Sequence, residues 1–124
     1  MSDIRSHQDL RVWQKSIDLV LDVYKLTAKF PSHERFGLSS QMQRAAVSIP
    51  ANTAEGHARG TRNDFAHFLD MANGSVAELD TLLAIACKLS YCEAKERSTI
   101  NEQLAEIGKM LGGLRMKLRS NSGN

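Results

Sequence analysis

Apolar residues return every three or four positions along four stretches of this 124-residue chain. That spacing places side chains on one face of an α-helix. The first predicted helix runs from about Asp9 to Lys29, the second from about Leu38 to Ala58, and the third from a Thr61–Asp64 capping pair to about Leu89. In the first helix, the main stripe of residues at this spacing comprises Leu10, Trp13, Ile17, Val20, Tyr24 and Thr27.

The third and fourth helices carry stripes of the same kind, and the fourth alternates strictly between steps of four and three. The third stripe comprises Phe65, Phe68, Ala72, Leu79, Leu82, Ala86 and Leu89, and the fourth comprises Ile100, Leu104, Ile107, Leu111, Leu114 and Leu118. Short links separate the helices, and no stretch alternates with the period of a strand. The pattern predicts an all-α, up-down-up-down four-helix bundle with shallow crossing angles of about 20°.

The length predicts one bundle domain over residues 9–119, with flexible ends at 1–8 and 120–124. The first helix has more apolar residues than one core face needs. Its second stripe comprises Val12, Leu19, Val23, Leu26 and Phe30. A helix that is apolar on two sides is buried on two sides, either at the centre of the bundle or in a subunit interface. We favour self-association.

Pro50 lies in the middle of the second predicted helix and has no N–H to bond the carbonyl of Ala46. We therefore expect a kink in this helix. Polar residues at steps of three and four share one face of it, which predicts a solvated surface or a partner-binding stripe. This polar stripe comprises Gln41, Arg44, Ser48, Asn52 and Glu55, with Arg59 as its continuation.

Composition excludes several classes of protein. The formal charge of +2 is too small to predict nucleic-acid binding by itself. No apolar run is long enough to span a membrane, and no apolar region marks the N-terminus as a signal peptide, so we expect no membrane partner and a cytoplasmic protein. Cys87 and Cys92 are expected to stay free thiols, because two cysteines make no disulfide framework. Gly108, Gly112 and Gly113 are expected to allow close helix approach.

No residue pattern identifies a reaction, a metal or a cofactor. Glu55 and Glu78 are better read as partners of arginines across helices, for example Arg44 or Arg59, than as a catalytic pair. Ser48 and Ser75 have no nucleophile motif around them. The four histidines lack metal-ligand spacing. We therefore expect a protein that is not an enzyme, with no catalytic residue, no metal and no cofactor.

Basic residues give the clearest functional signal. In an up-down-up-down bundle, the link between the second and third helices lies at the same end as the C-terminus of the fourth. The residues expected to form a basic end surface there are Arg59, Arg62, Lys109, Arg115, Lys117 and Arg119. Such a surface suits phosphate contacts of low sequence specificity, and a symmetric ring would repeat it. The alternative is that these cations only favour the helix dipole and keep the surface solvated.

Several segments resemble a known family. They are Leu10-Arg11-Val12-Trp13-Gln14-Lys15, Phe30-Pro31, Phe36-Gly37-Leu38, Gln41, the run from Arg44 to Gly56, Phe65, Phe68-Leu69, Gly74-Ser75 and Glu78-Leu79. In this order they resemble the four-helix bundle proteins encoded in intervening sequences of bacterial 23S rRNA genes, over about residues 9–118. Small departures occur at Thr53, Gln43 and Asp64, where that family favours isoleucine, arginine and glutamate.

The resemblance implies a helical bundle that assembles into a ring-shaped homo-oligomer, a pentamer. A similar bundle is the accessory protein of diversity-generating retroelements, which binds nucleic acid and a reverse transcriptase. Two functions therefore stay open for this chain. The first is an oligomeric RNA- or DNA-binding accessory protein that uses the basic end. The second is a protein-interaction scaffold that uses the polar stripe to hold a protein partner.

Overall fold

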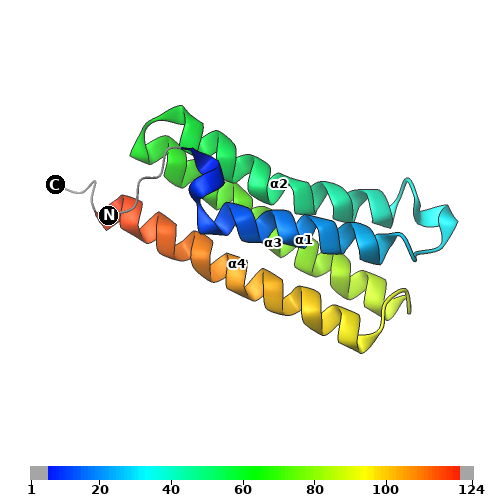
Figure 1. The fold of residues 1–124 in the computed structure, drawn as a ribbon. Helices are drawn as coiled ribbons and strands as arrows, with labels where there is room; N and C mark the ends of the chain where they lie inside the picture. The colour runs from blue at the N-terminus through cyan, green and yellow to red at the C-terminus, as the bar shows by residue number, and fades with distance from the viewer. Residues whose placement is uncertain (1–5, 121–124) are drawn as a thin grey trace.

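The computed structural model describes residues 6–120, and those residues form helices joined by short links, with no strand among them. The elements in chain order are η1 (His7–Asp9), α1 (Arg11–Thr27), η2 (Ser32–Glu34), α2 (Leu38–Arg59), α3 (Arg62–Lys88) and α4 (Ala94–Ser120). Successive helices run in opposite directions (Figure 1). The predicted all-α four-helix bundle is confirmed.

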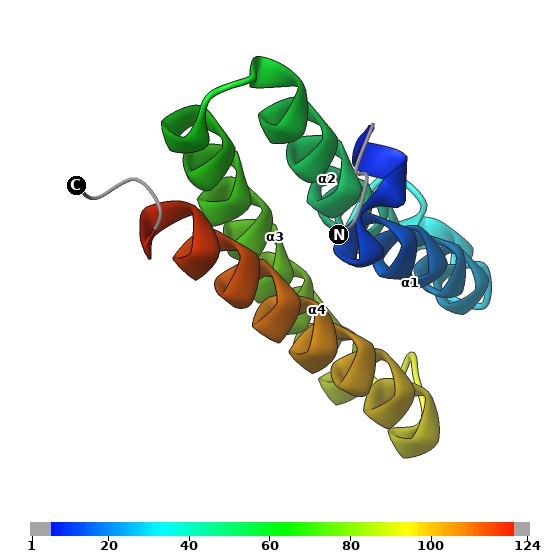
Figure 2. The same cartoon turned by 60° about the vertical axis from the view of Figure 1, so that its left-hand side comes forward.

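The four long helices pack in a closed cycle, in which each helix contacts the helices before and after it. The contact between α2 and α3 is the most extensive and that between α1 and α4 the least. Figure 2 shows α1 beside α2, and α3 beside α4. Leucine, isoleucine and methionine side chains fill the centre, and the fully buried ones include Leu19, Met42, Ile49, Leu79, Leu83, Ile107 and Leu111.

The start of α1 is set by a cap on the short helix that precedes it. The Ser6 hydroxyl accepts from Gln8 N–H at 3.2 Å, and the Asp9 carboxylate accepts from Ser6 N–H at 3.4 Å. This is a capping box, and it begins η1 rather than α1. Leu10 then adopts an extended conformation, so α1 begins at Arg11 and not at Asp9.

The predicted flexible ends lie mostly outside the described residues, which exclude 1–5 and 121–124. Within the described part, residues 6–8 take part in the cap, and α4 includes Ser120.

The second apolar stripe of the first predicted helix, rather than the main one, is buried along its whole length. The residues assigned to the second stripe (Val12, Leu19, Val23, Leu26 and Phe30) are buried within this single chain. The main stripe is buried only at its two ends, at Leu10 and Thr27. Its middle lies at the edge of the bundle, where Trp13, Ile17 and Val20 are half-buried and Tyr24 is exposed. The spacing of apolar residues reveals both stripes, but it does not determine which stripe faces the core, because both repeat with nearly the same period.

The other predicted stripes are largely confirmed. In α4, Ile100, Leu104, Ile107 and Leu111 are buried, and Leu114 and Leu118 pack partly against the core. The stripe of α3 is shifted at both of its ends. Leu69 and Leu83, which were not part of the predicted stripe, are buried. Of the predicted residues, Phe65 and Phe68 are half-buried and Leu89 is exposed.

Pro50 is buried in the middle of α2, and the helix continues on both sides of it from Leu38 to Arg59. Nearby side chains bond the helix carbonyls. Asn52 Nδ2 donates to the Ser48 carbonyl at 2.8 Å, and Thr53 Oγ1 donates to that of Ile49 at 2.9 Å. The kink expected at Pro50 stays a prediction about the direction of the helix axis.

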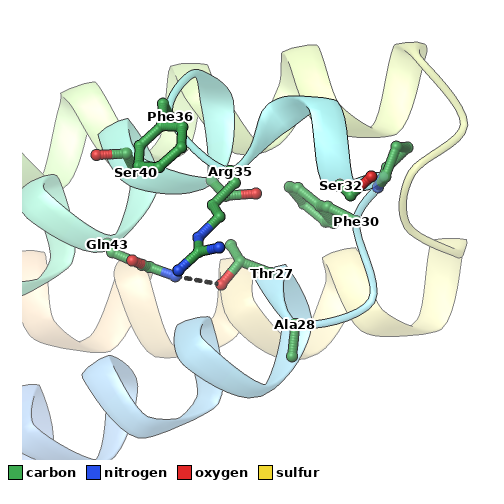
Figure 3. Close-up of a pocket in the computed structure, with 10 residues that line it drawn as sticks. Thr27, Ala28, Phe30, Ser32, Arg35, Phe36, Ser40 and Gln43 are labelled. Atoms are coloured by element: carbon green, nitrogen blue, oxygen red, sulfur yellow. Dashed lines mark hydrogen bonds between the residues drawn. The ribbon is translucent and has the colours of Figure 1, made fainter.

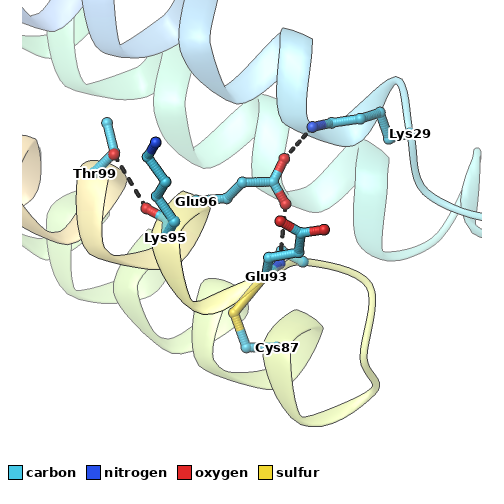
Figure 4. A network of polar contacts seen from close by, with 7 residues as sticks. Lys29, Cys87, Glu93, Lys95, Glu96 and Thr99 are labelled. Atoms are coloured by element: carbon cyan, nitrogen blue, oxygen red, sulfur yellow. Dashed lines mark hydrogen bonds and ion pairs between the residues drawn. A yellow bond between two sulfur atoms is a disulfide. The ribbon is translucent and has the colours of Figure 1, made fainter.

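The turn between α3 and α4 holds a disulfide, so the expectation of two free thiols is wrong. Cys87 and Cys92 are bonded, with Cα atoms 5.0 Å apart (Figure 4). Ser90 adopts a left-handed conformation with φ of 66°, and Tyr91 N–H then bonds back to the Ala86 carbonyl at 2.9 Å. This helix-ending turn reverses the chain within five residues and brings the two sulfurs together, which spacing alone does not reveal.

The glycines of α4 do not mediate close helix approach, contrary to expectation. A Cβ at Gly112 or Gly113 would meet no atom within 4 Å, and at Gly108 only Asn73 Oδ1 at 3.9 Å. The close approach is at Gly56 of α2 instead. Gly60 ends α2 with φ of 86°, a conformation that favours glycine.

None of the helices within residues 6–120 combines the length and the apolar composition needed to cross a membrane.

Candidate nucleic-acid and partner surfaces

The chain segments predicted to form the basic end of the bundle lie together in the structure. The link from α2 to α3 and the C-terminal end of α4 lie at the same end of the molecule (Figure 1). Thr61 fixes the start of α3, because its hydroxyl accepts from Asp64 N–H at 3.1 Å. The six candidate residues therefore come from the end of α2, the start of α3 and the second half of α4.

Arg59 and Arg115 pair with acidic side chains. Arg59 Nη2 donates to Glu55 Oε2 at 2.9 Å, and its guanidinium lies 4.9 Å from the centre of the Phe68 ring. Arg115 Nη2 donates to Asp70 Oδ2 at 2.8 Å, an ion pair that joins α4 to α3. This hydrogen bond raises the pKa of Arg115 above its ordinary value. Arg115 is therefore chiefly a structural link between two helices.

The other four cations are Arg62, Lys109, Lys117 and Arg119, and all four are exposed. Lys117 and Arg119 lie in the last turn of α4, and Arg62 is the first residue of α3. Lys109 lies near the middle of α4, further from the end. The basic end surface is thus defined here as Arg62, Lys117 and Arg119, with Arg59 and Lys109 at its border.

The polar stripe of α2 is not one continuous surface. Gln41 and Arg44 are exposed, whereas Ser48 and Asn52 are half-buried. The hydroxyls of Ser48 and Ser75 form a hydrogen bond 2.5 Å long between α2 and α3. The middle of the stripe therefore holds helices together, and only its two ends are open to a partner.

The residues considered for chemistry have ordinary structural contacts. Glu55 pairs with Arg59 as expected, although within α2 and not across helices. His57 stacks edge-on against Phe65, with ring centres 5.7 Å apart. Across residues 6–120, no three histidine, cysteine or acidic side chains are grouped closely enough to hold a metal ion.

Residues 8–113 match the sequence profile of the family described as 23S rRNA-intervening sequence protein. The chain belongs to this family. A solved structure of a protein of unknown function, from the S23 ribosomal protein family of Bacteroides thetaiotaomicron VPI-5482, has the same fold. It is 25% identical, the match covers 85% of this chain and 95% of that one, and the TM-score is 0.79. No curated protein matches this chain.

Residues 44–56 are the longest run that carries the family resemblance, and packing accounts for most of this segment. Small and apolar side chains along it are buried against the rest of the bundle: Ala45, Ala46, Ile49, Pro50, Thr53 and Gly56. Gly56 lies where α2 approaches the Phe65 and Phe68 side chains of α3. In this 23S rRNA-intervening sequence protein, the segment thus chiefly serves the packing of α2 against the bundle, and Arg44 and Glu55 are its exposed charged residues.

Sequence reasoning missed two surfaces. One is the exposed apolar face of α1, where Leu21 is 56% exposed and Tyr24 46% exposed beside the half-buried Ile17 and Val20. The other is a hollow at the link between α1 and α2, next to Phe36, which is 88% exposed. The sequence signal for this hollow is the aromatic Phe36 next to Gly37, which precedes α2.

Proposed function

We propose that this chain is a non-enzymatic, self-associating protein that binds RNA or DNA through its basic end surface. The observation that carries the proposal is the exposure of Arg62, Lys117 and Arg119 at one end of the bundle. Exposed lysines and arginines are the groups that make phosphate contacts in nucleic-acid complexes. The structural neighbour is assigned to a ribosomal protein family, which supports an RNA partner for this chain as well.

Self-association would make this small surface effective. Three cations on one chain bind phosphates weakly, but a ring repeats them once per subunit and raises the effective concentration of each site. The exposed apolar face of α1 supports such an assembly, since its side chains Ile17, Val20, Leu21 and Tyr24 lie next to one another at helical spacing. The stoichiometry we propose is five, following the family resemblance.

The test compares two triple variants that remove the same charge from opposite ends of the bundle. The first replaces Arg62, Lys117 and Arg119 by glutamine. The control replaces Lys25, Lys88 and Lys95, three exposed lysines in the last turns of α1 and α3 and the first turn of α4. Binding to single- and double-stranded RNA and DNA is measured at about 50 and about 200 mM salt, a range over which phosphate contacts weaken strongly.

We expect the unmodified protein and the control variant to bind with similar salt dependence. The first variant should lose about 0.9 in the slope of log affinity against log salt for each duplex contact removed, and about 0.7 for single strands. Equal loss in both variants would place the binding surface elsewhere. Absence of binding by the unmodified protein at low salt would end the nucleic-acid proposal and leave the protein-interaction scaffold as the better function.

A further inference from the structure

A hollow of about 540 Å³ lies at the end of the bundle opposite the basic end surface, where α1 passes through the η2 link into α2. Its size falls in the range of small-molecule sites, about 300–1,000 Å³. Figure 3 shows Arg35 pointing into the space between Thr27 and Gln43, with Phe36 and Phe30 on either side. This hollow is separate from every residue used in the proposed function.

Hydrogen-bond donors gather on one wall of the hollow at the start of α2. Leu38 N–H is already taken, because it donates to Glu34 Oε1 at 3.1 Å. The next two N–H groups, of Ser39 and Ser40, belong to the first helical turn and have no partner inside the helix. The positive end of the helix dipole adds to them, and such an arrangement favours an anion.

Ser39 gives independent evidence for a ligand. It lines the hollow, is only 6% exposed, and its hydroxyl has no hydrogen-bond partner among residues 6–120. The Ser39 oxygen is not among the fully buried side-chain atoms that lack a partner, so it is reachable from the hollow, where a hydroxyl can donate to an incoming acceptor. By contrast, the nearby Thr27 hydroxyl is used twice: it donates to the Val23 carbonyl at 2.9 Å and accepts from Gln43 Nε2 at 3.0 Å.

Arg35 supplies the charge. No acidic side chain in the described part of the chain pairs with it, and its guanidinium lies 5.3 Å from the centre of the Phe36 ring. The neighbouring carboxylate, Glu34, does not line the hollow. Both of its oxygens already accept hydrogen bonds, from Leu38 N–H and from the Tyr91 hydroxyl. A ligand anion would therefore meet an unpaired guanidinium.

The aromatic residues indicate what else the ligand carries. Phe36 is 88% exposed at the rim, and Phe30 and Pro31 form part of the lining. An exposed phenyl ring beside a cation suits a planar group that stacks on it. We propose that this hollow binds a small phosphate monoester with a planar substituent: Arg35, Ser39 and Ser40 hold the phosphate, and Phe36 packs on the planar group.

The test uses phenyl phosphate as the probe, with inorganic phosphate and phenol as its two halves. Amide chemical shifts are followed by NMR during each titration of the full chain. We expect saturable shifts at Ser39 and Ser40 with phenyl phosphate, weaker ones with inorganic phosphate, and none with phenol. Arg35→Gln should weaken phenyl phosphate binding about tenfold, the loss of one charge-assisted hydrogen bond.

Three further variants sharpen the result. Ser39→Ala should weaken binding of both phosphate probes. Phe36→Ala should weaken phenyl phosphate but leave inorganic phosphate unchanged. Lys88→Gln removes one positive charge outside the hollow and should bind as the unmodified protein does. Thermal unfolding of each variant shows that it is folded.

Several results would overturn the proposal. They are the absence of saturable shifts at millimolar phenyl phosphate, equal binding of phenol, equal binding of inorganic phosphate, and unchanged affinity in the Arg35→Gln variant. None of these depends on nucleic-acid binding at the other end of the bundle, so the proposed function and this inference fail separately.

Discussion

At the residue scale, the spacing between α2 and α3 depends on the absence of a side chain at Gly56. A Cβ there would lie 2.7 Å from the Cβ of Phe68 and 3.1 Å from Cδ1 of Phe65. The first contact is with an atom fixed to the α3 backbone, which a change of rotamer does not move. The two most extensively packed helices would have to separate to admit it.

We therefore predict that Gly56→Ala destabilises the fold. Alanine gains about 1 kcal/mol of helix propensity over glycine, but overpacking costs about 1–3 kcal/mol and should exceed the gain. The matched control is Gly112→Ala, an exposed helical position where an added Cβ meets nothing within 4 Å. That change should stabilise the protein by about 1 kcal/mol. Urea unfolding measures both, and equal stabilisation by the two substitutions would contradict the close approach.

Glu34 links the two chain reversals at one end of the bundle. Its carboxylate accepts from Leu38 N–H at 3.1 Å and from the Tyr91 hydroxyl at 2.9 Å. The hydrogen bond from the Leu38 backbone, followed by that from Tyr91, lowers the pKa of Glu34 below its ordinary value of 4.5. A lowered pKa means that this group stabilises the fold above its unfolded pKa, and that the stabilisation is lost as the pH falls through the folded pKa.

We predict that Tyr91→Phe moves the pKa of Glu34 upward, toward 4.5, because the hydrogen bond from Tyr91 is lost while the Leu38 hydrogen bond and the His33 ring remain. The acid-induced loss of stability should then begin at a higher pH. Carbon-13 NMR of the Glu34 carboxyl during a pH titration measures the shift directly. Tyr24→Phe is the control, since the Tyr24 hydroxyl has no hydrogen bond within residues 6–120. An unchanged titration in Tyr91→Phe would show that the hydroxyl does not reach the carboxylate in solution.

At the scale of elements, the helices followed from the sequence because their apolar period is regular and their caps are local. The Thr61–Asp64 cap was found in this way, and the observed bounds of α2 and α3 agree closely with the predicted bounds of the second and third helices. The burial of each stripe in α1 did not follow, since that depends on where α2 and α4 lie. The pairing of Arg115 with Asp70 was missed for the same reason: it joins residues 45 apart.

The link between α3 and α4 is held by both polar and covalent contacts (Figure 4). Glu96 Oε1 accepts from Glu93 N–H at 2.9 Å at the start of α4, and its other oxygen pairs with Lys29, which follows the end of α1. The backbone contact, followed by Lys29, lowers the pKa of Glu96 below 4.5. The disulfide closes the same turn, so this link is fixed by more than its sequence spacing indicates.

We predict that reducing the Cys87–Cys92 disulfide lowers the free energy of unfolding by about 2 kcal/mol, the value expected when so short a loop is released in the unfolded chain. Urea unfolding with and without dithiothreitol measures the difference. The double variant Cys87→Ser, Cys92→Ser should be insensitive to the reductant. If the unmodified protein is equally insensitive, the disulfide adds nothing to stability. In a reducing compartment the same two residues would be thiols.

At the scale of the whole molecule, the two ends of the bundle carry different chemistry. One end presents the basic end surface, and the other presents the hollow beside Arg35. The exposed apolar face of α1 lies along the side between them. An assembly through the sides of the bundles would leave both ends open. This arrangement is the one that a ring with a repeated nucleic-acid surface requires.

We predict that the apolar face of α1 forms the subunit interface. Leu21→Lys with Tyr24→Lys places two cations on this face, where burial in an interface would be strongly unfavourable, yet both side chains are exposed in the single chain. The variant should therefore fold as a monomer. The control is Ile85→Lys with Leu89→Lys, two exposed apolar residues of similar exposure and spacing at the end of α3. Sedimentation equilibrium measures the mass of all three proteins.

The unmodified protein and the control should sediment at five times the 13.8 kDa mass of one chain, and the α1 variant at that mass. A different multiple shared by the first two would correct the stoichiometry and keep the interface. A monomeric unmodified protein at micromolar concentration would contradict self-association itself. If only the α3 control dissociates, the interface lies on α3, and the exposed residues of α1 are then the surface left for a protein partner.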